Sequence, residues 1–213
     1  MTSQRCQIHS SFKNWPKQFF DWLISFFSIL ILSPLFLISW PILYFFNGRP
    51  IIFKQKRLGK NAQSFTIYKL RSMVNNAETL RNRQQKKYES LNYAPKPMFK
   101  IADDPRFTKI GRWLSHAGLD ELPQLINVLK GEMTLVGPRP LPNKEVLTLK
   151  KLKPDWFAWR QSVKPGIFSL WTLDDRRHQS LKIWQELEKE TLKLNLWQQY
   201  YLIGQVLLKQ LKK

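Results

Sequence analysis

The chain has 213 residues and one cysteine, Cys6, so it suits a single folded domain with an appendage and excludes an internal disulfide. Its 35 lysines and arginines against 15 aspartates and glutamates give a formal net charge of +20 at pH 7, which favours an anionic partner. No helix-turn-helix, zinc-finger or aromatic RNA-binding motif is present, so acidic lipids or phosphorylated substrates are expected rather than nucleic acid.

The first predicted element is an uncharged run at residues 22–46, which as a straight helix of about 37 Å would cross a bilayer. Pro34 lies near its centre, where it removes a backbone hydrogen bond and kinks the helix, while Ser33 can bind the freed carbonyl. Basic residues flank both ends, which favours both ends on the cytoplasmic side. They are Arg5, Lys13 and Lys17 before the run, and Arg49, Lys54, Lys56, Arg57 and Lys60 after it. From these residues alone, a spanning helix, an uncleaved signal anchor and a re-entrant hairpin all stay open.

Residues 50–73 alternate apolar and basic side chains around Gly59 and Asn61, which predicts two short strands joined by a turn. Within the second strand, Lys69 and Arg71 are two residues apart, so both are expected on one face. That face either binds an anion or is simply solvated. Residues 74–89 are polar and predict a solvated helix.

The sequence from Leu119 to Gly131 predicts a short helix with two adjacent carboxylates at its start. Pro123 fits only a first turn, and Gly131 is a typical C-terminal stop. Asp120 and Glu121 therefore lie at the positive end of the helix, where a phosphate would also bind. Either Asp120 is an N-cap and Glu121 a first-turn acid, or a carboxylate here attacks phosphorus or holds a divalent metal.

The C-terminal part, from Leu181, has apolar and aromatic residues close to helical spacing, which predicts one or two amphipathic helices. The residues are Trp184, Leu187, Leu194, Trp197, Tyr201, Leu208 and Leu211. These helices either pack on the core or lie at a membrane surface, with Lys209, Lys212 and Lys213 facing anionic lipid.

Several motifs in the right order resemble the bacterial sugar transferases, the monotopic polyprenyl-phosphate phosphoglycosyl transferases that start exopolysaccharide and glycan assembly. The resemblance covers most of residues 47–140. The motifs are Phe53-Lys54-Gln55-Lys56-Arg57-Leu58-Gly59-Lys60-Asn61, Phe65-Thr66-Ile67-Tyr68-Lys69-Leu70-Arg71-Ser72-Met73, Asp104-Pro105-Arg106-Phe107-Thr108-Lys109-Ile110-Gly111-Arg112, Leu119-Asp120-Glu121-Leu122-Pro123-Gln124 and Gly137-Pro138-Arg139-Pro140.

The resemblance implies an α/β fold with three parts. Residues 1–46 are expected to hold an N-terminal segment and a re-entrant membrane hairpin. Residues 47–178 are expected to form a small cytosolic catalytic domain, and residues 179–213 interfacial amphipathic helices. The expected location is the bacterial inner membrane, with the active site on the cytoplasmic face.

The resemblance also implies the chemistry. Asp120 would attack the sugar-bearing phosphate of a nucleotide diphosphate sugar, of the uridine type, and form an acyl phosphate that polyprenyl phosphate then resolves. Glu121 would hold Mg²⁺, and Lys69, Arg71, Arg112 and Arg139 would bind phosphates. Arg139 is the best of these cations, because Pro138 and Pro140 stiffen its backbone. Anionic membrane lipids are expected partners, and a homodimer stays open.

Three departures from the family pattern weaken these expectations. Ser115-His116-Ala117-Gly118 stand where the family usually has basic residues, and Ile167-Phe168-Ser169 replace Thr-Gly-Leu. The acidic residue expected near the tail is not identified among Glu186, Glu188 and Glu190. The alternative is therefore a catalytically weakened member that serves as a membrane-bound partner in glycan assembly.

Overall fold

The computed structural model describes residues 15–212. Cys6, the flanking charges Arg5 and Lys13, and the predicted lipid-facing Lys213 therefore lie outside the described residues. Helices α1–α5 are Trp15–Asn47, Ala77–Arg83, Gln85–Ser90, Lys109–His116 and Leu125–Leu129. Helices α6–α10 are Asn143–Leu152, Pro154–Gln161, Leu170–Leu173, Leu181–Lys193 and Leu196–Leu211. The 3-10 helices are η1, Lys60–Ala62, and η2, Leu119–Gln124, and strands β1–β4 are Ile52–Leu58, Ser64–Leu70, Thr134–Val136 and Gly166–Phe168.

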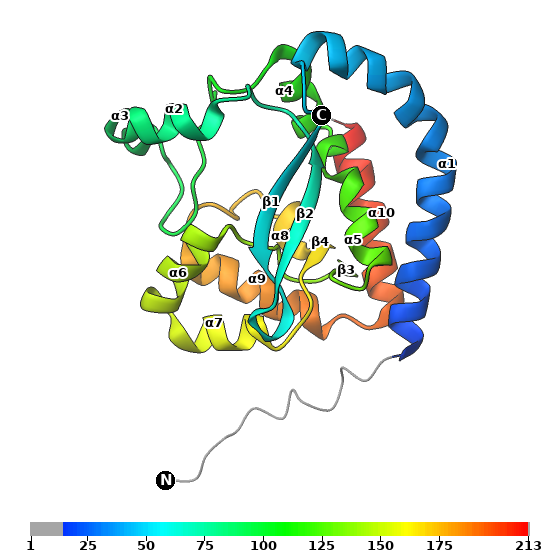
Figure 1. Cartoon of the computed structure of the whole chain (residues 1–213). Coiled ribbons are helices and arrows are strands. Elements are labelled where there is room, and N and C mark those ends of the chain that lie inside the picture. The colour runs from blue at the N-terminus through cyan, green and yellow to red at the C-terminus, as the bar shows by residue number, and fades with distance from the viewer. Residues whose placement is uncertain (1–14, 213) are drawn as a thin grey trace.

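Two small sheets lie among the helices, so the predicted α/β domain is confirmed in a helix-rich form (Figure 1). Strands β1 and β2 form an antiparallel hairpin that pairs Ile52 with Leu70, which confirms the two predicted strands. Strands β3 and β4 are parallel, with Thr134 opposite Gly166. A Cβ on Gly166 would lie 2.1 Å from the backbone nitrogen of Gly137, so the close approach of these two segments requires glycine.

The C-terminal helices pack into the same core as the sheets. Leu202 and Val206 of α10 join a cluster with Ile67 and Leu135, while Trp184 of α9 belongs to a second cluster. The outward side of α10 is apolar as well: Trp197 is 83% exposed, and Tyr201 and Leu208 are exposed beside it. Helix α9 therefore follows the packed alternative, and α10 presents a second apolar stripe to its surroundings.

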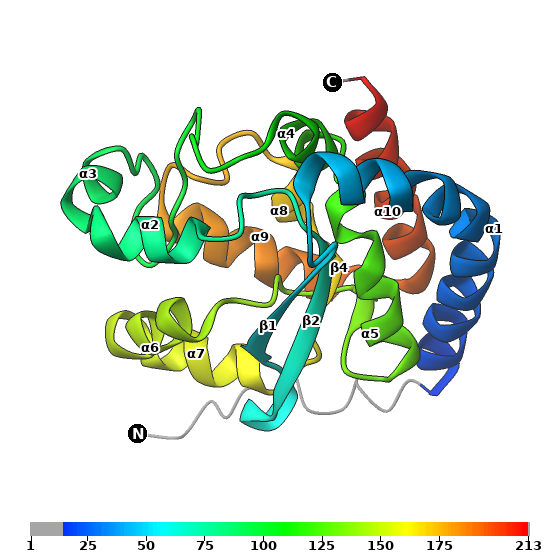
Figure 2. The same cartoon turned by 45° about the horizontal axis from the view of Figure 1, so that its top comes forward.

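Helix α1 is one continuous helix that contains Pro34 and Pro41, and it bends as it passes around the domain beside α10 (Figures 1 and 2). Ser33 Oγ donates a 2.8 Å hydrogen bond to the carbonyl of Leu30, the group that Pro34 leaves without an amide partner. The predicted role of Ser33 is confirmed. Two separate hairpin helices are not seen. By length and composition alone, α1 could cross a membrane, and only 6% of its apolar window is buried in the protein.

Both ends of α1 are attached to the folded domain. Near its start, the Asp21 carboxylate accepts hydrogen bonds from the Leu135 amide, at 3.2 Å, and from Thr134 Oγ1. At its end, the guanidinium of Arg71 donates to the carbonyls of Asn47, Gly48 and Arg49, where the Arg49 bond is 2.7 Å. The apolar middle of the helix remains exposed, with Ile31 74% and Leu37 75% accessible.

Candidate active site

The start of η2 places two carboxylates at its first turn. Gly118 precedes the helix with a φ of +69°, a left-handed conformation that glycine adopts without strain, and occupies the cap position. No side chain caps this helix by a hydrogen bond. The interpretation of Asp120 as the N-cap is therefore wrong, because the cap position lies two residues earlier, at Gly118, which leaves Asp120 and Glu121 both inside the first turn.

Glu121 is held by two cations. Its Oε1 accepts a 2.7 Å hydrogen bond from Lys69 Nζ and another of 2.7 Å from Arg139 Nη2. Lys69 is in reach because alternate residues of β2 face η2, and Ile67 on that same face is buried in the core. Burial alone would raise the pKa of Glu121, but the positive charges of Arg139 and Lys69 outweigh it and hold the pKa well below its usual range.

Asp120 is buried without such support. It is 7% exposed, and within residues 15–212 its carboxylate makes no hydrogen bond or ion pair. Burial raises the pKa of Asp120 to about 6, with repulsion from Glu121 adding to the rise and attraction to Lys69 and Arg139 opposing it. Two adjacent carboxylates thus have pKa values displaced in opposite directions, an arrangement typical of catalytic sites.

The loop that carries Arg139 is held in place by a hydrogen bond from Arg160 to its backbone. Arg160 donates to the carbonyl of Arg139 and pairs with the fully buried Glu188. Glu188 also accepts hydrogen bonds from Trp156 Nε1, at 3.1 Å, and Trp184 Nε1, at 3.0 Å. Among the three acidic residues considered in the tail, Glu188 therefore has a positioning role that reaches Arg139 through Arg160.

Two further cations belong to this site but were not predicted as site residues. Arg57 of β1 donates 2.9 Å from Nη1 to the carbonyl of Pro140, and its buried Nε has no hydrogen-bond partner in the described chain. Burial and repulsion from Arg139 lower the pKa of Arg57 to about 10. Desolvation, together with Arg139 and Lys69, lowers the pKa of Lys100 to about 8. The basic run before Gly59 was a signal for Arg57, whereas Lys100 lies in a segment without a regular pattern.

Two predicted phosphate-binding residues lie elsewhere. Arg71 follows the last residue of β2 and is buried against the end of α1, where its guanidinium binds main-chain carbonyls. The expectation that Arg71 shares the face of Lys69 is wrong, because the strand ends at Leu70. Arg112, which lies on α4, pairs at 2.7 Å with the exposed Asp103. The structure therefore brings together Asp120, Glu121, Lys69 and Arg139, and uses Arg71 and Arg112 in other contacts.

Comparison with known proteins identifies a protein family whose sequence pattern matches this chain. A family model described as bacterial sugar transferase matches residues 12–210. The exopolysaccharide production protein ExoY of Sinorhizobium fredii is 35% identical over 160 residues, which are 75% of this chain and 69% of that protein. The galactosyl transferase CpsE of Streptococcus agalactiae is 42% identical over 132 residues, 62% of this chain and 28% of that protein.

A third relative is the undecaprenyl-phosphate galactose phosphotransferase of Salmonella typhimurium, 36% identical over 160 residues that make up 75% of this chain and 33% of that protein. The chain therefore spans about two thirds of the first relative and about a third or less of the other two.

Proposed function

The chain belongs to the bacterial sugar transferase family, and on this premise we propose that it transfers a sugar phosphate from a nucleotide diphosphate sugar to polyprenyl phosphate. The name of the Salmonella relative, a phosphotransferase acting on undecaprenyl phosphate, supports this reaction. The exopolysaccharide role of ExoY supports a place at the start of glycan assembly. The enzyme is then a phosphoglycosyl transferase.

The observation that carries the proposal is the buried Asp120 carboxylate, which has no hydrogen-bond or ion-pair partner in the described chain. It lies beside Glu121, whose Oε1 is held by Lys69 and Arg139. In the first step, a carboxylate oxygen of Asp120 attacks the phosphorus bonded to the sugar. The bond from that phosphorus to the bridging oxygen breaks, and nucleoside monophosphate leaves. In the second step, a polyprenyl phosphate oxygen attacks the same phosphorus, frees the Asp120 carboxylate and yields polyprenyl diphosphate sugar.

The cations around Glu121 suit this chemistry, because donor and acceptor are both polyanions. Lys69 and Arg139 lie where they can shift from Glu121 to phosphate oxygens when the donor enters. The unpaired Nε of Arg57 is a buried donor that an oxyanion would satisfy. Three cations therefore converge on the place where the two phosphorylated substrates must meet.

A magnesium ion fits the donor set of this site. Mg²⁺ prefers oxygen ligands and is commonly held by one or two carboxylates together with substrate phosphates. Glu121 would hold the ion, with the donor diphosphate completing its ligands. The bound ion would neutralise charge on the diphosphate. Within residues 15–212 no group of three or more histidine, cysteine, aspartate or glutamate side chains could hold a metal, so a site made by protein alone is not indicated.

The attachment of α1 supports a placement on one face of the membrane. Because Asp21 and Asn47 at opposite ends of the helix both bind the same folded domain, both ends must lie on the side of that domain. The exposed middle around Pro34 would then enter the lipid and return, as in a re-entrant hairpin. The basic residues that flank the helix favour the cytoplasmic face.

The alternative, a catalytically weakened assembly partner, is disfavoured by this set of carboxylates and cations, which a purely structural role does not require. The test is turnover of a panel of nucleotide diphosphate sugars with polyprenyl phosphate and Mg²⁺ in detergent, measured as nucleoside monophosphate release. We expect release with at least one donor, its loss in Asp120→Asn, and its retention in Asp103→Asn, which changes an exposed aspartate. No release with any donor would favour the assembly partner.

A further inference from the structure

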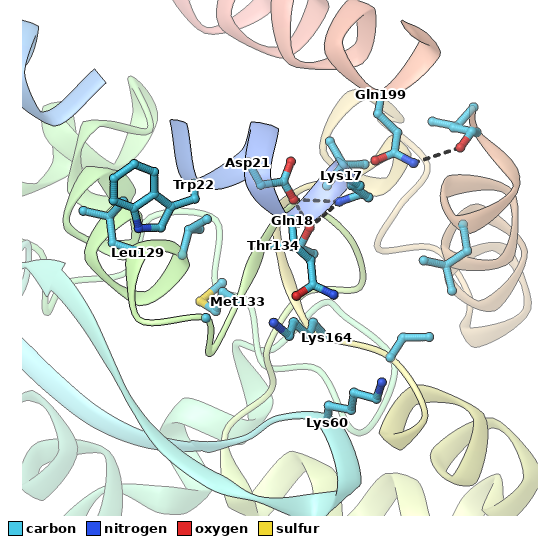
Figure 3. A pocket seen from close by; sticks show the side chains of 16 residues that line it. Lys17, Gln18, Asp21, Trp22, Lys60, Leu129, Met133, Thr134, Lys164 and Gln199 are labelled. Atoms are coloured by element: carbon cyan, nitrogen blue, oxygen red, sulfur yellow. Dashed lines mark hydrogen bonds and ion pairs between the residues drawn. The ribbon is translucent and has the colours of Figure 1, made fainter. Parts of the chain in front are cut away.

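A second pocket lies at the other end of the η2–α5 segment from Asp120, between the start of α1 and the junction of α9 and α10. Its volume is about 260 Å³. One side is apolar and includes Trp22 of α1, Leu129 at the end of α5, and Leu194 before α10. The other side is basic, with Lys17, Lys60 and Lys164 brought together from three distant parts of the chain. Figure 3 shows Lys17 beside Thr134, with Lys164 and Lys60 farther along the pocket.

The three lysines of this pocket are unequally neutralised. Lys17 pairs with Asp21 at 2.7 Å, and that carboxylate is already shared with Thr134 and the Leu135 amide. Within the described part of the chain, the side-chain ammonium groups of Lys60 and Lys164 make no ion pair or hydrogen bond. Burial lowers the pKa of Lys164, and repulsion from the positive charges of Lys60 and Lys17 lowers it further. An anion bound here would remove that repulsion.

The size and lining of the pocket restrict the ligand. Sites for whole small molecules are about 300–1,000 Å³, so this pocket suits one polar group rather than a nucleotide sugar. The apolar lining continues onto the outside of α1, because Trp22 is 42% exposed and stacks on Phe26 with ring centroids 5.4 Å apart. A ligand that follows this lining therefore has an anionic head in the pocket and an apolar tail along α1.

We propose that this pocket binds the phosphate headgroup of an anionic membrane phospholipid, with Lys60 and Lys164 as the headgroup ligands and Trp22 beside the acyl chain. Basic pockets beside membrane-embedded helices on the cytoplasmic side are known to take anionic headgroups. This site is separate from the Asp120–Glu121 site. The inference rests on the membrane placement of α1 in the proposed function but not on the transfer reaction.

The experiment counts lipids bound to the full chain in detergent by native mass spectrometry, with short-chain phosphatidylglycerol as the probe. We expect phosphatidylglycerol to bind and phosphatidylcholine, which has no net charge, to bind at least about tenfold more weakly. Lys60→Gln with Lys164→Gln should weaken phosphatidylglycerol binding about tenfold to thirtyfold. The matched control, Lys86→Gln with Lys87→Gln, removes the same charge from the exposed face of α3 and should leave binding unchanged.

Each single variant, Lys60→Gln or Lys164→Gln, should show part of the loss of phosphatidylglycerol binding. The proposal can therefore still be tested if the double variant fails to fold. Equal weakening in the control pair would overturn the proposal, as would equal binding of phosphatidylcholine. Displacement of the lipid by millimolar inorganic phosphate would indicate a free-phosphate site, and displacement by a short polyprenyl phosphate would assign the pocket to the acceptor; both outcomes contradict it. Nucleoside monophosphate release from donor alone should be unchanged in the variants, so failure here is distinguishable from failure of the proposed reaction.

Discussion

Replacing Asp120 by Asn should abolish transfer and at the same time stabilise the folded protein above pH 6. Burial raises the pKa of this carboxyl from 3.8 to about 6 in the folded state. The folded state thus binds more protons than the unfolded state between these values, and its stability falls as pH rises through that window. At 1.36 kcal/mol for each tenfold change in proton affinity, ionised Asp120 costs the fold up to about 3 kcal/mol above pH 6. Asparagine has nearly the same shape and no charge, so it removes this cost.

The assay is thermal unfolding in detergent at pH 8 and pH 4.5, followed by circular dichroism. For a chain of this size, up to about 3 kcal/mol corresponds to a rise in Tm of up to about 6–12 °C at pH 8. At pH 4.5 the rise should shrink to about a third of that, because the folded carboxyl is then protonated while the unfolded one, with its pKa of 3.8, is still mostly ionised. The control is Asp103→Asn, whose carboxyl is exposed and should give the same Tm as the wild type at both pH values. A loss of stability in Asp120→Asn at pH 8, or a gain of equal size at both pH values, would refute the reasoning.

Three further variants test other parts of the account. Glu121→Gln should lose most turnover and need more Mg²⁺, because it removes the negative charge that Lys69 and Arg139 share; an unchanged magnesium titration would argue against metal binding there. Arg139→Lys keeps the charge but loses the planar fork, so turnover at limiting donor should fall about ten- to a hundredfold, and wild-type kinetics would exclude a phosphate-binding role. Pro34→Leu should straighten α1 and lower activity, and a tag at residue 2 that becomes accessible from outside spheroplasts would report the change to a spanning helix.

Local patterns were enough to predict the elements whose signal lies within a few residues. The alternation before and after Gly59 predicted the β1–β2 hairpin, and helical spacing predicted α9 and α10. Ser33 was expected to bind the carbonyl freed by Pro34, and it does so at Leu30. Each of these features depends on one local interaction: the spacing of apolar side chains along the strand or helix, or one hydrogen bond to a nearby carbonyl.

The parts that local patterns missed depend on where a strand or turn ends. Arg71 was placed with Lys69 by alternation, but β2 stops one residue earlier and Arg71 binds the end of α1 instead. One interpretation made Asp120 the N-cap, but the left-handed Gly118 occupies the cap position two residues earlier. Arg57 reaches the site only through the packing of β1 on the segment that follows Arg139, and no short-range pattern contains that contact.

The central claim is a covalent bond between Asp120 and the phosphosugar, and its most direct test needs donor but no acceptor. Incubated with its nucleotide diphosphate sugar and Mg²⁺, the full chain should gain the mass of one phosphosugar and release one nucleoside monophosphate. The adduct should map to Asp120, break down in hydroxylamine as an acyl phosphate does, and form more slowly as pH falls through about 6. Asp120→Asn should form no adduct. Wild-type transfer by Asp120→Asn, or an adduct on another residue, would contradict the account.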